Sequence, residues 1–462
     1  MTKLNLTAPE SLACLAVRLG LDFNATSWLD RDAKRTQVER HMRICLAATD
    51  GFRMMFTVSP SEPLLAEASW MVMRKWLGPK EAPAALLHHI TDSYLNAGER
   101  GEVVGALLLL LARDNAIRNR ETLNPEPSKP SKNASPKELK HDGVTQRRII
   151  TVLEFLDALV PPASRLYVRE LRPTRCSPHH SPSASLAEVF AEANIYFNHF
   201  IKVHDSKMLN REYLWRLLCR GAAIICANNQ RGVDLVVPVL RGNLLRPRSI
   251  TAILIQVKND ARFTSHLSRT LFTTMDPFKI DLFSKDGDAF PPILRIVFAL
   301  ASERSSVVAP SLPTRCSPRL NSKDKFTAYD LWIAGVSSQS FGVIPDKQTH
   351  DQYRLLLHRT RNIFNGYGAV TSDGGALNVE EAPRIDCRRM MHAAAASGTL
   401  HFQNYIQNPI SHKDCGGMDE EEEGGRSEDS DASETDLDVS EADSDVSKAN
   451  SDVMEVMEVD HT

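Results

Sequence analysis

Apolar residues recur at three- and four-residue spacing through most of residues 8–118, a period that predicts amphipathic helices. The pattern is carried by the segments SLACLAVRLGL, LLAEASWMVMRKWLG and GERGEVVGALLLLLARDNAIRNR. The longest apolar run, VVGALLLLLA at 103–112, is too short to span a bilayer, so we expect a buried helix there and no membrane association. Residues 8–118 are therefore predicted to form a helical N-terminal domain, a candidate surface for a protein partner.

The next two segments are punctuated by proline and serine. Residues 119–145 are Pro/Ser/Lys-rich and are typical of a flexible linker. Residues 146–185 are expected to hold one helix at 147–160 and a Pro/Ser-rich loop, in which the hexapeptide PTRCSP (173–178) is the first of two copies. The second copy is at 313–318, and we interpret both as inserted low-complexity loops. The alternative is a metal site built from Cys176, His179 and His180.

Residues 186–365 change to short apolar runs that predict an α/β domain. A helix is expected over 185–203 and a second over 206–221, with Gly221 as its C-cap. A third helix is expected at 351–364. Strands are expected at 222–227, 233–240, 250–258, 293–302 and 329–336, with a helical or mixed stretch between the third and fourth strands. The resulting order is helix, three strands, helix, strand.

The charge of the chain is divided unevenly. Residues 419–462 hold 18 Asp/Glu and 2 Lys/Arg, a net charge of −16, and are predicted to be a disordered acidic tail that follows an irregular extension at 366–418. The other 418 residues then hold 53 Lys/Arg and 40 Asp/Glu, a net charge of +13. A basic body suits a polyanionic partner such as nucleic acid, and an ordinary solvated basic surface is the alternative.

The eight cysteines form no CxxC pair and no Cys/His grouping with zinc-finger spacing. That usage is typical of a reduced compartment, and the first residues, MTKLNLTAPE, do not resemble a signal peptide. We therefore expect an intracellular protein, nuclear or cytoplasmic. The sequence does not indicate an oligomeric state.

Three polar residues interrupt the apolar strands. Asp234 lies within VDLVVPVL, and Gln256 and Lys258 lie within ITAILIQVK. Because side chains alternate along a strand, Gln256 and Lys258 share one face. If the two strands pair through the turn near Gly242, Asp234 approaches both. A carboxylate and an amide oxygen can share Mg²⁺ or Mn²⁺ while the lysine orients a water, which suits phosphodiester hydrolysis. The structural alternative is that Asp234 caps a turn, that Gln256 forms a hydrogen bond with a backbone group and that Lys258 is an ordinary lysine at the end of a strand.

The arrangement Asp234 … Gln256-Val257-Lys258 resembles the PD-(D/E)XK nuclease superfamily, and within it the branches with glutamine in the middle position, such as Mrr-type enzymes. The resemblance implies a restriction-endonuclease-like αβββαβ core. Two departures are Val233, where the family has proline, and Gln256, where it more commonly has an acidic residue. Over residues 50–365 the chain also resembles an expanded family of basidiomycete (mushroom-forming fungal) proteins, a likeness that implies no activity.

The resemblance also implies an acidic residue on the first helix of the core. Glu212 is the first candidate for this catalytic role, beside Lys258, and Glu192 is the second. Asp234 and Gln256 would be the metal ligands. Arginines that surround these positions in the sequence are candidates for phosphate contacts, with DNA favoured over RNA: Arg231, Arg241, Arg246, Arg248 and Arg262. The alternative is a non-enzymatic protein-interaction module in which the nuclease-like core is a scaffold.

Overall fold

A computed structural model describes residues 5–21, 29–48, 55–90, 97–123, 148–228, 230–284, 290–310 and 326–358. The extension at 366–418, the acidic tail, the second PTRCSP copy and all but the first residues of the predicted linker lie outside these ranges. The helices are α1 (Pro9–Leu19), α2 (Leu29–Arg40), α3 (Pro63–Trp76), α4 (Glu81–Ile90), α5 (Ala97–Leu123), α7 (Val152–Leu159), α8 (Arg165–Arg169), α9 (Leu186–Val189), α10 (Arg211–Arg220), α11 (Arg269–Thr274) and α12 (Lys347–His358).

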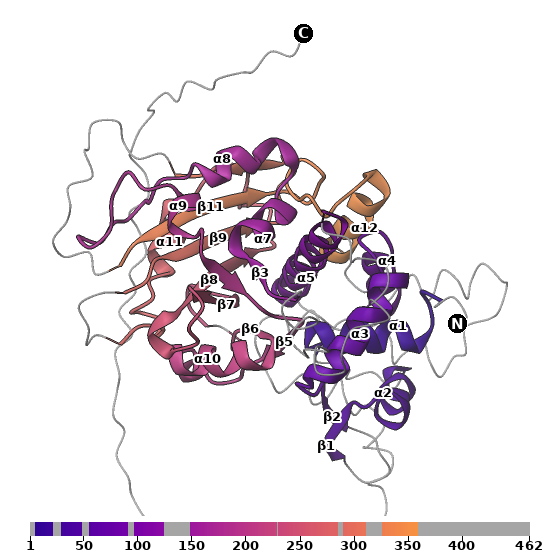
Figure 1. The fold of residues 1–462 in the computed structure, drawn as a ribbon. Coiled ribbons are helices and arrows are strands. Elements are labelled where there is room, and N and C mark those ends of the chain that lie inside the picture. The colour runs from indigo at the N-terminus through magenta and orange to yellow at the C-terminus, as the bar shows by residue number, and fades with distance from the viewer. Residues whose placement is uncertain are drawn as a thin grey trace, which may run out of the picture. The chain divides into compact units, whose positions relative to one another are not determined.

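The strands build a mixed sheet (Figure 1). In the described residues, nine strands join it: β3 (Ile150–Thr151), β4 (Ala193–Ile195), β5 (His199–Lys202), β6 (Ala222–Ile225), β7 (Leu235–Arg241), β8 (Ile250–Lys258), β9 (Ile293–Ala299), β10 (Ser306–Val308) and β11 (Ala328–Ala334). Strand β7 pairs antiparallel with β8, β6 and β4, whereas β8, β9 and β11 run parallel. A separate hairpin joins β1 (Ile44–Ala48) to β2 (Met55–Val58).

Both faces of the sheet are buried, which explains its nearly continuous apolar strands. Alternate residues of β7 and β8, such as Leu235 and Ile255, belong to one hydrophobic cluster with α1, α3, α4, α5, α7 and α12. The residues between them, such as Val236 and Leu254, belong to a second cluster with α10 and α11. The N-terminal helices thus share a core with one face of the sheet.

Several predicted elements are present in the structure. Strand β8 has the predicted bounds, and α10 ends at Gly221, whose left-handed conformation (φ 64°) makes it the C-cap. The run at 103–112 lies inside α5 and is buried. Among the described helices, none is both long enough and apolar enough to cross a membrane. The elements α10, β6, β7, β8, α11 and β9 come in the predicted order of helix, three strands, helix and strand.

Two secondary-structure predictions are wrong. The helix expected at 185–203 is only the short α9, followed by β4 and β5. Ala193, Ile195 and Phe197 are all buried, a period of two that indicates a strand. The hairpin β1–β2 interrupts the region expected to be helical. Its two apolar runs flank the sequence Asp50–Gly51, a strong hairpin signal that the helical interpretation overlooked.

The first PTRCSP copy is a loop, as predicted, but it is packed against the sheet. Arg175 forms an antiparallel bridge with Ala328 at the start of β11, and its guanidinium lies 4.3 Å from the ring centroid of Phe326. Thr174 Oγ1 donates to Asp330 Oδ2 at 2.6 Å. His180 Nδ1 lies 3.0 Å from the hydroxyl of Thr327, a contact that gives this histidine a structural partner.

Candidate active site

Asp234 lies at the point where β6, β7 and β8 meet. Its backbone N–H donates to Ile255 O at 2.9 Å, and its carbonyl accepts from Cys226 N–H at 2.8 Å. Its carboxylate Oδ2 accepts from the backbone N–H of Val257 at 2.6 Å. The bonds to β8 involve the residues on both sides of Gln256. The strand pairing predicted from the sequence therefore brings Asp234 beside Gln256.

The turn before Asp234 depends on Gly232. This residue has φ 87°, and a Cβ added to it would stand 2.2 Å from the carbonyl oxygen of Thr274 at the end of α11. A side chain cannot be accommodated there without moving the backbone. The close approach of the turn to α11 fixes the entry of the chain into Val233 and Asp234.

Gln256 and Lys258 lie on the face of the sheet opposite α5. Val257 faces α5, because its methyl groups lie 3.2 and 3.1 Å from the positions that Cβ atoms would take at Gly101 and Gly105. Its two neighbours therefore point to the other face, as predicted. Gln256 is only 6% exposed. Lys258 is half-buried, with Nζ 5.6 Å from the ring centroid of Phe263.

A second carboxylate, Glu102 of α5, approaches Asp234, and the sequence did not predict it. Gly101 and Gly105 let the α5 backbone pack closely on Val257, Asn259 and Leu235. This packing places Glu102 near enough for the Asp234 charge to act on its carboxyl. The available signal was a glutamate on a buried apolar helix, between two glycines four residues apart.

The electrostatics of the two carboxyls are coupled. Burial and the charge of Asp234 raise the pKa of Glu102 to about 7, against the opposing effect of Lys202. Burial also raises the pKa of Asp234, although the Val257 N–H and the Lys258 charge act in the opposite direction. Two acids whose ionised forms are disfavoured by burial, one of them also by its neighbour's charge, are characteristic of functional sites.

The structure does not bring the predicted Glu212 to this cluster. Glu212 is exposed in the first turn of α10 and pairs with Arg216 at 2.6 Å. Its neighbour Arg211 donates to the carbonyl of Arg248, just before β8 begins, whereas Gln256 is near the end of that strand. Glu192, the second candidate, also lies at that opposite end, where its carbonyl accepts from Gly242 N–H.

The predicted phosphate-binding arginines divide between the two ends of the sheet. Arg231 precedes Asp234, and Arg262 follows β8, where it pairs with Asp260 at 2.7 Å. Arg241, the last residue of β7, and Arg246 and Arg248 in the β7–β8 connection lie at the other end. Arg241 is seven residues beyond Asp234 along the strand, or about 23 Å. The five arginines were predicted to act together because they are close in the sequence, but the antiparallel strands place them at opposite ends of the sheet.

The oxygen atoms near Asp234 are of the kind that a hard divalent cation prefers, but they are few. Among the described residues, no group of three or more His, Cys, Asp and Glu side chains could hold a metal ion. The charge of Asp234 nevertheless acts on the carboxyl of Glu102, and Gln256, on the other face of the sheet, has a buried Oε1 without a hydrogen-bond partner. A buried amide oxygen without a partner is costly, and a cation or a water bound to one would satisfy it.

The chain was also compared with known proteins. No family model, curated protein or solved structure matches it.

Proposed function

We propose that the chain is a metal-dependent nuclease, or a descendant of one that still binds nucleic acid, with a restriction-endonuclease-like core. The observation that carries the proposal is the buried carboxylate of Asp234, which is bonded to the Val257 N–H between Gln256 and Lys258 and whose charge acts on Glu102. Asp234 and Glu102 would hold Mg²⁺ or Mn²⁺, whereas Gln256, on the other face of the sheet, would bind a water or contact the substrate. Glu102 takes the acidic role expected of Glu212.

The bound ion would supply charge neutralisation at the scissile phosphate. The chain's own residues have distinct tasks. The Val257 N–H holds the carboxylate of Asp234 in one orientation, so it does not have to be ordered when substrate binds. Lys258 is close enough to Asp234 to act on its charge and would orient the attacking water or contact the phosphate.

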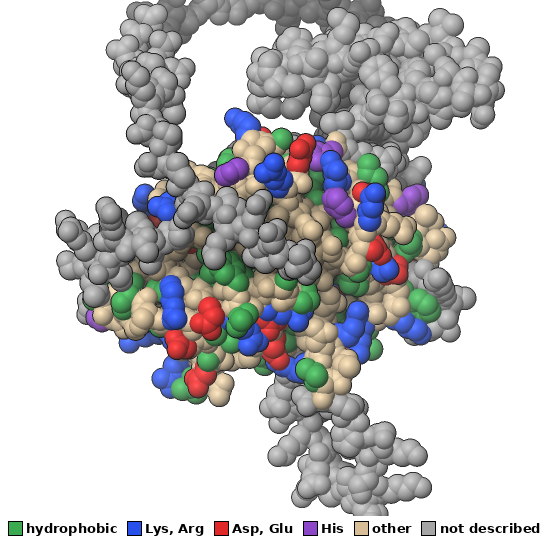
Figure 2. Space-filling view, turned by 90° about the horizontal axis from the view of Figure 1, so that it is seen from above, with side chains coloured by type: hydrophobic (Ala, Val, Ile, Leu, Met, Phe, Trp, Pro, Cys, Tyr) green, Lys and Arg blue, Asp and Glu red, His purple; other side chains and the backbone are tan. Residues whose placement is uncertain are grey.

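The charge distribution supports a nucleic acid partner only locally. On the face shown in Figure 2, the Lys and Arg side chains of the described residues are interspersed with Asp and Glu and do not form one patch. Arg231 and Arg262 are the predicted phosphate contacts that lie at the Asp234 end of the sheet. Such contacts give affinity without sequence readout. DNA remains the favoured substrate, as a proposal.

Incubation of the full chain with supercoiled plasmid, single-stranded DNA and RNA tests the proposal. Cleavage is expected with Mg²⁺ or Mn²⁺ and not with EDTA, and it is expected to be lost in Lys258→Ala. Purified protein that neither cuts nor binds any of the three polymers would refute the proposal.

A second candidate function, a protein-interaction module, is favoured by one observation. Leu64, Met71 and Val72 on α3 are 83%, 62% and 36% exposed. Leu64 and Met71 are seven residues apart and therefore lie on one face of the helix. If a partner binds there, Met71→Glu abolishes its binding without affecting nucleic acid cleavage.

A further inference from the structure

Ser61, His199 and Asn198 form a relay of side chains outside the proposed nuclease site. Ser61 Oγ lies 3.0 Å from His199 Nε2, and His199 Nδ1 lies 2.7 Å from Asn198 Oδ1. An amide oxygen only accepts, so Nδ1 carries the proton and Nε2 is left to accept from the serine hydroxyl. A hydroxyl, a base and a residue that orients the base are the parts of an activated nucleophile.

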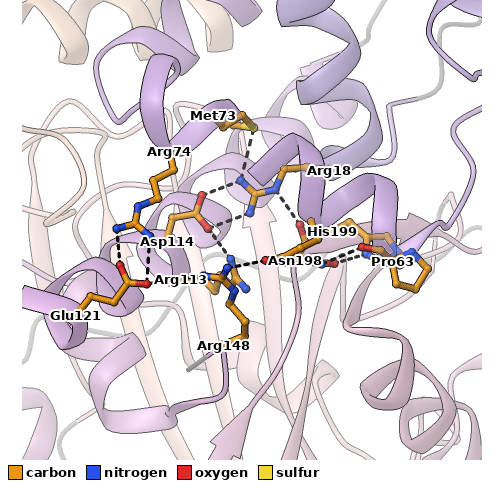
Figure 3. A network of polar contacts seen from close by, with 11 residues as sticks. Arg18, Pro63, Met73, Arg74, Arg113, Asp114, Glu121, Arg148, Asn198 and His199 are labelled. Atoms are coloured by element: carbon orange, nitrogen blue, oxygen red, sulfur yellow. Dashed lines mark hydrogen bonds and ion pairs between the residues drawn. The ribbon is translucent and has the colours of Figure 1, made fainter. Parts of the chain in front are cut away.

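The position of Asn198 is fixed from several sides. Its amide nitrogen donates to Pro63 O and to Glu67 Oε2, both at 3.4 Å, which directs Oδ1 toward His199. Its backbone carbonyl accepts from the buried Arg18 at 2.9 Å, within the network in Figure 3. Asn198 and His199 are 1% and 0% exposed, so the base is held in a single orientation away from solvent.

Ser61 is more exposed than its base. The residue is half-buried, in the segment before α3. Arg220, at the exposed end of α10, donates through Nε to Ser61 Oγ at 3.3 Å and through Nη2 to the Ser61 carbonyl. These two bonds hold both the side chain and the backbone of Ser61 in place.

We propose that Ser61 is a nucleophile for acyl transfer, with His199 as its general base and with Asn198 and Arg220 as positioning residues. This activity is separate from the proposed nuclease function and does not depend on it.

The step balances with the groups present. Ser61 Oγ forms a bond to the acyl carbon while its proton passes to His199 Nε2, and that proton then leaves with the alcohol or thiol whose bond to the acyl carbon breaks. Water reverses the sequence and releases a carboxylic acid. Burial, Arg220 and Arg18 lower the pKa of His199 to about 4, so it is a weak base. The substrates are therefore activated acyl groups, thioesters or aryl esters, and not amides.

An alkyl fluorophosphonate probe tests the nucleophile. The serine oxygen forms a bond to phosphorus and fluoride leaves. Labelling of the Ser61 peptide, read by mass spectrometry, is expected in the full chain and in Ser59→Ala. It should be lost in Ser61→Ala and reduced at least 100-fold in His199→Gln. Absence of labelling, or equal labelling in folded His199→Gln, overturns the proposal.

A cysteine variant guards against misfolding of His199→Gln. In Ser61→Cys, the thiol is expected to react with iodoacetamide at least 10-fold faster than the thiol of Ser59→Cys at pH 7, because the Arg220 guanidinium beside position 61 favours the thiolate. Equal rates in the two variants overturn the activation of position 61.

The pH dependence of labelling tests the role of Asn198. Labelling of the parent chain should persist to pH 5, since His199 stays neutral there. In Asn198→Asp a carboxylate beside Nδ1 favours the imidazolium, so the acid limb of the pH profile moves upward. An unchanged profile, with labelling retained, contradicts the positioning role.

Discussion

The carboxylate of Asp234 accepts a hydrogen bond of 2.6 Å from the backbone N–H of Val257, between Gln256 and Lys258 in the sequence. This bond joins the start of β7 to the end of β8, and it holds an acidic side chain at the place where Glu102 arrives from α5. Asp234, Gln256 and Lys258 all lie at this one end of the sheet. The consequences for cation binding, stability and cleavage can each be measured.

Magnesium should stabilise the chain through Asp234 and Glu102. At a concentration ten times its dissociation constant, a ligand of the folded state adds about 1.4 kcal/mol, or about 2–4 °C in Tm. Thermal melts with Mg²⁺ should show this rise in the parent chain and in Glu212→Gln. Asp234→Asn, whose amide oxygen still accepts from Val257, should show none. An equal rise in Asp234→Asn would place the ion elsewhere.

Glu102 should make stability depend on pH. Its folded-state pKa of about 7 is raised above the ordinary value of 4.5, so its contribution is fully present below pH 4.5 and is lost as pH rises through 7. The shift corresponds to about 3 kcal/mol. Denaturant titrations in EDTA should therefore show the parent losing stability relative to Glu102→Gln between pH 5 and pH 8. A difference independent of pH would show that the carboxyl is not perturbed.

The close packing of α5 should make Gly101 sensitive to a single methyl group. Alanine normally stabilises a helix interior by about 1 kcal/mol relative to glycine. At position 101 its Cβ would stand 2.9 Å from Cβ of Asn259, so we expect Gly101→Ala to destabilise by about 1–3 kcal/mol. Gly105→Ala, which meets only side-chain ends at 3.1 and 3.2 Å, should cost less. Stabilisation in Gly101→Ala would contradict this packing.

Removing one member of the buried ion pair Arg295–Asp330 should destabilise the fold more than removing both. The side chains are bonded at 2.6 and 2.7 Å on neighbouring strands, β9 and β11, and are 5% and 3% exposed. Arg295→Met leaves a buried carboxylate without its counterion and should cost about 3–5 kcal/mol, whereas adding Asp330→Leu should recover most of that loss. If the double variant is less stable than Arg295→Met, the carboxylate left without a counterion is not the cause of the loss.

The sequence predicted what depends on local patterns. Strand β8 and the face shared by Gln256 and Lys258 follow from the alternation of apolar residues, and Gly221 follows from the end of a helical period. Apolar residues alternate at positions 193, 195 and 197, which favours a strand, but the helical pattern of the segment before them led to the prediction of a helix. Asp50–Gly51 was likewise a readable hairpin signal.

The remainder depends on contacts that are distant in the sequence. Glu102 reaches Asp234 across 132 positions, because two glycines let α5 lie on β8. Glu212 was favoured because it is on the helix before the strands, yet α10 begins at the other end of the sheet. The register of β7 and β8, which separates Arg241 from Arg231, likewise comes from the fold and not from spacing.

The most direct test of the account is the initial rate of plasmid cleavage in Mg²⁺ by the parent chain, Asp234→Asn, Glu102→Gln and Glu212→Gln. If Asp234 and Glu102 hold the catalytic ion, the rate is at least 100-fold lower in Asp234→Asn and Glu102→Gln and unchanged in Glu212→Gln, all with circular dichroism like that of the parent. Cleavage that survives Asp234→Asn at the parental rate, or that is lost only in Glu212→Gln, would contradict it.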